Sequence, residues 1–70
     1  MKKEIIRSIG EEKRVKNLDL FVKFISQRFP DEPNEIKYYV EEWADRFNGG
    51  SPEGYMDGIS RSIYEELKNE

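Results

Sequence analysis

Apolar side chains recur every three or four residues along three stretches of this chain, and this spacing constrains the fold more than any other feature. Such intervals place side chains on one face of an α-helix, whereas a half-buried strand requires intervals of two. Proline and glycine separate the three stretches. The sequence therefore predicts an all-α protein with helical stripes at Val15, Leu18, Val22, Ile25 and Phe29, at Ile36, Val40, Trp43 and Phe47, and at Met56, Ile59, Ile63 and Leu67.

Two signals compete for the start of the first main helix. Ser8 and Glu11 have the spacing of a capping box, which predicts a helix that begins at about residue 11. Asn17 is the alternative N-cap, with a strand or loop before it. Under both interpretations the helix ends at about residue 29, because Pro30 disfavours the helical conformation of the residue before it.

Glycine and proline also predict the boundaries of the later helices. Gly49 in a left-handed conformation would end the second main helix. Ser51 followed by proline has the pattern of an N-cap and first helical residue, although two nearby glycines make Asp57 an alternative start. We expect one helical domain spanning residues 1–70, a small bundle with main helices at about 11–29, 34–48 and 52–68.

The N-terminal segment, residues 1–10, is basic and carries three isoleucines. They would share one face of a short helix, whereas in a strand Ile6 would oppose the other two, and both interpretations stay open. Residues 1–16 hold six basic and three acidic residues, whereas residues 17–70 hold six basic and twelve acidic ones. The basic segment therefore either packs on the acidic remainder or contacts nucleic-acid phosphates. The candidates for phosphate contact are Lys2, Lys3, Arg7, Lys13, Arg14 and Lys16.

Several kinds of chemistry are excluded by composition. The chain has neither cysteine nor histidine, which removes the commonest catalytic bases, thiolate nucleophiles and zinc ligands. Glu41, Glu42 and Asp45 share a helix face, which we interpret as solvated, because one helix offers a metal ion too few oxygens. The glycine-rich residues 48–54 lack the lysine and the spacing of a phosphate-binding loop. We expect no catalysis, no cofactor and no metal site.

The sequence also bears on the compartment. No stretch approaches the roughly 18 apolar residues that a membrane-spanning helix needs, and the N-terminus lacks the apolar run of a secretory signal. The absence of cysteine is typical of a reducing compartment. We therefore expect a cytoplasmic protein that has no contact with a membrane.

Apolar residues outside the three stripes are the candidates for binding a partner. Leu20 and Phe24 point away from the stripe of their own helix, so either this helix is central, with the N-terminal isoleucines covering its second side, or another chain covers it. Tyr38 is expected on the acidic back of the second main helix, and Tyr55 and Tyr64 at the start and edge of the third. Exposed tyrosines are frequent anchors of protein interfaces.

Two functional hypotheses follow. The first is a small non-enzymatic module that binds a protein partner or a second copy of itself, through Leu20, Phe24, Tyr38, Tyr55 and Tyr64. Small acidic proteins without cysteine are often accessory proteins of phages or mobile elements that inhibit or modulate a host protein, and this analogy extends the first hypothesis. The alternative is a helical domain that binds nucleic acid through its basic N-terminal arm.

Overall fold

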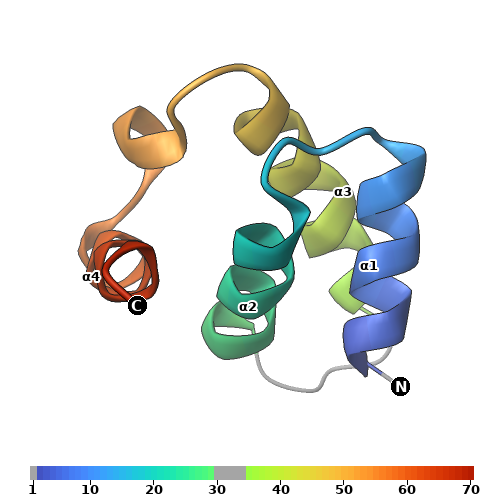
Figure 1. Cartoon of the computed structure of the whole chain (residues 1–70), viewed down its shortest axis with the longest axis horizontal. Coiled ribbons are helices and arrows are strands. Elements are labelled where there is room, and N and C mark those ends of the chain that lie inside the picture. The colour runs from blue at the N-terminus through green and yellow to red at the C-terminus, as the bar shows by residue number, and fades with distance from the viewer. Residues whose placement is uncertain (1, 30–34) are drawn as a thin grey trace.

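The computed structural model describes residues 2–29 and 35–70, whose regular secondary structure is entirely helical. The predicted all-α class is therefore confirmed. The described part of the chain forms four α-helices and a 3₁₀ helix, η1 (Figure 1). Their bounds are α1 Lys2–Glu12, α2 Leu18–Arg28, α3 Ile36–Asn48, η1 Pro52–Tyr55 and α4 Gly58–Lys68.

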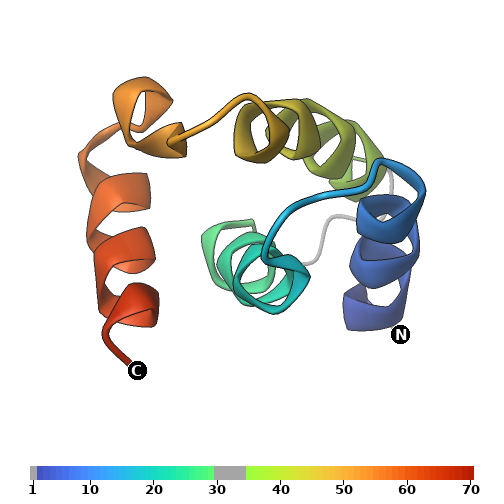
Figure 2. The ribbon, with the colours of Figure 1, turned by 45° about the horizontal axis from the view of Figure 1, so that its top comes forward.

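Helix α2 lies between α1 and α4, and α3 and η1 lie across the other helices (Figures 1 and 2). Polar contacts at the start and in the middle of α1 show that it runs antiparallel to α2. The ammonium of Lys2 donates to the carbonyl oxygen of Ser26 (3.2 Å), and Arg7 forms an ion pair with Asp19 (3.0 Å). The start of α1 therefore lies beside the end of α2.

Aromatic rings from three helices fill the centre of the molecule. Phe24 of α2 is fully buried, and its ring centroid lies 4.9 Å from that of Trp43, 5.7 Å from that of Phe47 and 6.3 Å from that of Tyr64. Phe21 meets Phe47 edge to face at 5.1 Å. A chain of this size without disulfides needs dense packing to be stable, and these rings provide it.

The predicted helix over residues 11–29 is wrong, because the chain turns at residues 13–17 between α1 and α2. Arg14 and Asn17 have positive φ angles of 57° and 51°, which end one helix and reorient the chain before the next. Ser8 lies inside α1, so the predicted capping box does not form. The alternative start at Asn17 has the right position, but its side chain makes no capping hydrogen bond. Helix α1 has 11 residues, as many as α2 and α4.

Gly10 does not interrupt α1 but lets it approach α2. It is buried, and a Cβ at this position would lie 2.6 Å from Cδ1 of Leu18 and 3.2 Å from two ring atoms of Phe21. Any larger residue would push against the second helix. The small size of this residue therefore sets the distance between the two helices.

The connection from α3 to α4 differs from the prediction in detail. Gly49 has a φ of −81°, and it is Gly50 that adopts a positive φ, 121°. Ser51 precedes only η1, without a side-chain cap, so the predicted helix over 52–68 is divided. Asp57 is the N-cap of α4, as in the later of the two predicted starts, and accepts from the amide of Ser60 at 2.7 Å. The predicted start of the preceding helix, residue 34, lies outside the described residues.

Candidate functional site

The structure separates the two residues that the sequence grouped as a partner-binding face of α2. Phe24 is fully buried among aromatic rings, so it is a core residue and not a surface for a partner. Leu20 is only half-buried. Helix α4 packs on the side of α2 that carries Phe24, where the ring of Phe24 meets that of Tyr64.

A groove lies beside Leu20, between the first turns of α2 and the last turn of α4. Its volume is about 400 Å³, which is within the range of small binding sites. Leu20 and Leu67 form the apolar part of its lining, and Lys23 and Lys68 belong to the polar part. The groove is lined by Asn17, Asp19, Leu20, Lys23, Leu67 and Lys68.

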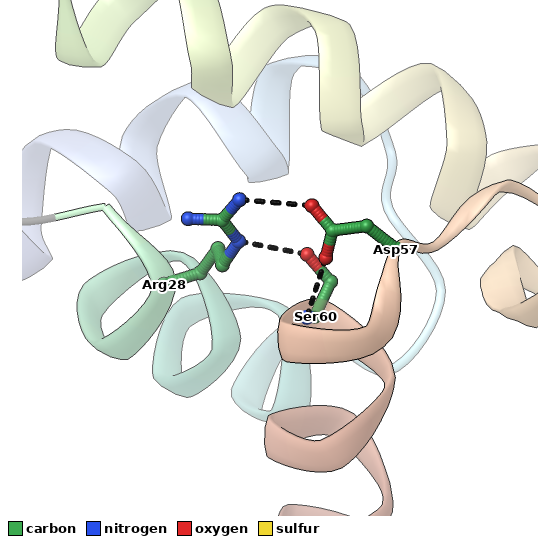
Figure 3. A network of polar contacts seen from close by, with 3 residues as sticks. All are labelled: Arg28, Asp57 and Ser60. Atoms are coloured by element: carbon green, nitrogen blue, oxygen red, sulfur yellow. Dashed lines mark hydrogen bonds and ion pairs between the residues drawn. The ribbon is translucent and has the colours of Figure 1, made fainter.

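A polar cluster at the opposite end of the α2–α4 pair holds the two helices in register (Figure 3). Nε of Arg28 donates to the hydroxyl of Ser60 (2.8 Å), and the guanidinium also donates to Asp57 (3.0 Å). Ser60 is fully buried, and its hydroxyl is satisfied by this contact. The hydrogen bond from the backbone amide of Ser60, together with Arg28, holds the pKa of Asp57 below its ordinary value.

A second polar contact connects η1 to the end of α4. The ammonium of Lys68 lies 2.6 Å from the carboxylate of Glu53. This hydrogen bond lowers the pKa of Glu53 and raises the pKa of Lys68. Lys68 therefore remains a cation at the edge of the groove at neutral pH.

The three tyrosines expected to bind a partner differ in exposure. Tyr38 and Tyr55 expose 65% and 66% of their surface, so both are accessible to a partner. Tyr64 exposes 8%, and its ring packs edge-on against Phe24 and Phe47. Tyr64 is thus a core residue, and of the three tyrosines only Tyr38 and Tyr55 are exposed.

Tyr38 is the outermost of a row of aromatic rings. Its ring centroid lies 5.6 Å from that of Tyr39, and Tyr39 stacks on Phe29 at 4.2 Å with an angle of 9° between the rings. Phe29 in turn lies 6.1 Å from Trp43, which belongs to the core. The row therefore connects an exposed side chain on α3 to the buried centre of the molecule.

Ile59 is an exposed apolar residue that the sequence pattern placed in the core. It exposes 65% of its surface, while Ser60, Tyr64 and Leu67 form the buried face of α4. The face differs from the predicted stripe because a serine occupies a core position, where Arg28 satisfies its hydroxyl. The apolar spacing of α4 gives no signal of this, because the buried position of Ser60 depends on Arg28 in another helix.

The basic N-terminal segment is a packed helix rather than an extended arm. Ile6 of α1 is fully buried, Lys2 donates to the end of α2, and Arg7 is paired with Asp19. Exposed cations remain at Lys3, Lys13, Arg14 and Lys16, with Glu11 and Glu12 also exposed at the end of α1. Nucleic-acid binding by these residues stays a prediction, which a gel-shift experiment at two salt concentrations tests.

Two carboxylates of α3, Glu41 and Glu42, form surface ion pairs. Glu42 accepts from Arg46 (3.0 Å), and Glu41 lies 4.0 Å from Lys37. Among residues 2–29 and 35–70, no three acidic side chains come together in a way that could hold a metal ion. Across the same residues, the helices are all too short or too polar to cross a lipid bilayer.

Comparisons with known proteins add no assignment to this geometry. No family model matches the chain, and neither a curated protein nor a solved structure resembles it significantly.

Proposed function

We propose that this chain is a non-enzymatic module that binds another protein, and that Tyr38 is a principal anchor of the interface. The observation that carries the proposal is the 65% exposure of Tyr38 at the outer end of a row of packed aromatic rings. Large exposed aromatic side chains dominate the binding energy of many protein interfaces. Tyr38 has both the size and the accessibility for this role.

The packing behind Tyr38 supports the same role. Immobilising a flexible side chain on binding costs about 0.5–1.5 kcal/mol. The ring of Tyr38 packs edge to face against Tyr39, which is stacked on Phe29. The guanidinium of Arg28 lies 5.1 Å from the centre of the Phe29 ring. An anchor supported in this way loses little conformational freedom when a partner covers it.

The test compares Tyr38→Ala with Tyr55→Ala in affinity capture from a lysate of the source organism. Tyr55 is a matched control, because its exposure is 66% and it has no ring contact with another residue of the described chain. We expect the bound protein to be retained by the wild type and by Tyr55→Ala, and its affinity for Tyr38→Ala to fall about ten-fold or more. Retention by Tyr38→Ala at full affinity would refute the role of this side chain.

Light scattering of the same variants tests whether the partner is a second copy of the chain. A homodimer that dissociates in Tyr38→Ala would identify the partner as the protein itself. If the protein is monomeric, the identity of the captured protein tests the accessory role in a phage or mobile element, in which the module inhibits or modulates a host protein. A capture that is empty for the wild type, together with a monomeric mass, would oppose protein binding altogether.

A further inference from the structure

The guanidinium of Arg28 contacts both the start of α4 and the ring of Phe29. At α4 it donates to the carboxylate of Asp57 (3.0 Å) and, through Nε, to the buried hydroxyl of Ser60 (2.8 Å), as Figure 3 shows. Its Cζ also lies 5.1 Å from the centre of the Phe29 ring, within the range of a cation–π contact. Only 26% of the Arg28 side chain is exposed, so these contacts restrict its movement.

Phe29 is fixed at its backbone as well as at its ring. It directly follows α2 in an extended conformation, and its amide donates to the carbonyl oxygen of Ile25 at 3.0 Å. Its own carbonyl oxygen accepts from the ammonium of Lys2. Because the backbone is held in this way, the direction of the ring depends on the side chains that touch it. Among the described residues, these are Tyr39, Trp43 and Arg28.

The orientation of the Phe29 ring affects Tyr38 through Tyr39. The rings of Phe29 and Tyr39 are almost parallel, so one ring cannot tilt unless the other follows or the stack opens. Tyr39 in turn meets Tyr38 edge to face, with an angle of 68° between the rings. Within the described chain, Tyr39 is the ring against which the exposed side chain of Tyr38 packs. The orientation of Tyr38 therefore depends on a row of contacts that ends at Arg28.

We propose that Arg28 is a positioning residue for Tyr38, because it holds the ring of Phe29 on which the aromatic row rests. This inference rests on the function proposed for Tyr38. Since the same guanidinium binds the N-cap and first turn of α4, the surface around Tyr38 depends on the docking of α4 on α2. A partner that covers Tyr38 therefore binds more tightly when α4 is docked, and by linkage its binding strengthens that docking.

Aromatic resonances of isotopically labelled protein test the positioning without a partner. The ring current of Tyr39 makes the chemical shifts of the Tyr38 ring sensitive to the angle between the two rings. In Arg28→Gln, we expect the ring resonances of Tyr38 and Tyr39 to move toward the values of an unfolded chain. Arg28→Lys keeps a cation at this position and should restore part of the change.

Arg7→Gln is the matched control for the loss of an arginine between two helices. Arg7 of α1 binds Asp19 of α2 at 3.0 Å, the same distance as the pair of Arg28 and Asp57. Within the described residues, Arg7 makes no cation–π contact. Its replacement should leave the resonances of Tyr38 unchanged.

Ser60→Ala tests whether α4 takes part in the positioning. It removes the hydroxyl that accepts from Nε of Arg28 but retains the arginine beside Phe29. We expect the Tyr38 resonances to shift in the same direction as in Arg28→Gln, by a smaller amount. Ser62→Ala, at an exposed position of the same helix, should cause no shift. Ser60→Ala also remains informative if Arg28→Gln does not fold.

Binding is measured with the protein that the wild type retains from the lysate. Arg28→Gln should weaken this binding by about two- to five-fold, the range for one cation–π contact at a partly exposed site. In the Tyr38→Ala background the same substitution should cause no further loss, because the side chain that Arg28 positions is absent. This dependence separates positioning from a direct contact of Arg28 with the partner.

Four outcomes would overturn the inference. The first two are unchanged Tyr38 resonances in Arg28→Gln, and shifts of equal size in Arg7→Gln. The third is a shift in Ser62→Ala as large as that in Ser60→Ala, which would remove the dependence on α4. The fourth is an equal loss of binding from Arg28→Gln with and without Tyr38. Full affinity of Tyr38→Ala would instead refute the proposed function, which the resonances of the free protein do not test.

Discussion

Replacement of Gly10 by alanine tests how closely α1 approaches α2. Alanine favours a helix interior over glycine by about 1 kcal/mol, so propensity alone predicts a more stable protein. The added Cβ would lie 2.6 Å from Cδ1 of Leu18 and 3.2 Å from two ring atoms of Phe21. Leu18 is half-buried and can move its terminal methyl group at little cost. Phe21 is fully buried and held edge-on by Phe47, so its ring cannot retreat.

The clash with Phe21 therefore decides the sign of the effect. Overpacking of a core by one carbon costs about 1–3 kcal/mol, which exceeds the gain in helix propensity. We expect Gly10→Ala to lower the free energy of unfolding by about 1–2 kcal/mol, out of roughly 3.5–10 kcal/mol for a chain of this length. Urea unfolding, followed by the fluorescence of Trp43 and by far-UV circular dichroism, measures this difference.

Gly58→Ala is the control, because this substitution is expected to raise the free energy of unfolding instead of lowering it. Gly58 begins α4, and a Cβ at this position would have no heavy atom within 4 Å. Alanine there is expected to stabilise the protein by about 0.4–1 kcal/mol, chiefly because it restricts the unfolded chain. An unfolding midpoint of Gly10→Ala equal to or above that of the wild type would refute the close approach of the two helices.

The remaining predictions concern the core, the cap of α4 and the turn after α1. Phe24→Ala should cost about 3–5 kcal/mol and unfold much of the protein, whereas Leu20→Ala should cost about 1 kcal/mol or less, as thermal unfolding would measure. The pKa of Asp57 is lowered in the folded state, so its contribution to stability is present above its unfolded pKa and is lost as pH falls through its folded pKa. Asp57→Asn keeps a capping side chain and should reduce the loss of stability below about pH 4. Arg14→Gly should stabilise the protein by up to about 1 kcal/mol in urea unfolding, because φ at this residue is 57°.

Each of these predictions has an outcome that contradicts it. Equal losses for Phe24→Ala and Leu20→Ala would mean that the two residues are buried alike. Acid unfolding that is unchanged in Asp57→Asn would mean that the cluster with Arg28 and Ser60 contributes no pH-dependent stability. Lys13→Gly is the control for the turn, since Lys13 has no positive φ, and a gain in stability there equal to that of Arg14→Gly would contradict the argument from backbone conformation.

The fold class was predictable because the apolar spacing of α3 matches the face that this helix buries. The boundary between α1 and α2 was not predictable in the same way. Val15 lies in the turn, yet it exposes only 9% of its surface, so it extends the helical stripe across residues that are not helical. The place of Gly10 inside a helix was equally hard to predict. Glycine is unfavourable in an isolated helix, and only the contact with Phe21, in another helix, explains its position.

The candidate surfaces were predictable to the extent that they depend on a single helix. Tyr38 lies opposite the buried face of α3, and helical geometry alone places it there. The exposure of Ile59 depends on a contact between two helices. The buried face of α4 includes Ser60, which accepts a hydrogen bond from Arg28 of α2. A pairing between residues 28 and 60 leaves no trace in the spacing of the apolar residues.

The same pairing between Arg28 and Ser60 explains why Phe24 is buried while Leu20, on the same side of α2, is partly exposed. Helices α2 and α4 run antiparallel, and Arg28 lies opposite Ser60. One helical turn back along α2, Phe24 lies opposite Tyr64, in agreement with the contact between their rings. A further turn brings Leu20 opposite Lys68, which is the last residue of α4. Phe24 is therefore covered by the middle of α4, while Leu20 meets its end, where the helix no longer covers it and the groove opens. The polar cluster at one end of the pair thus determines which apolar side chain is accessible at the other.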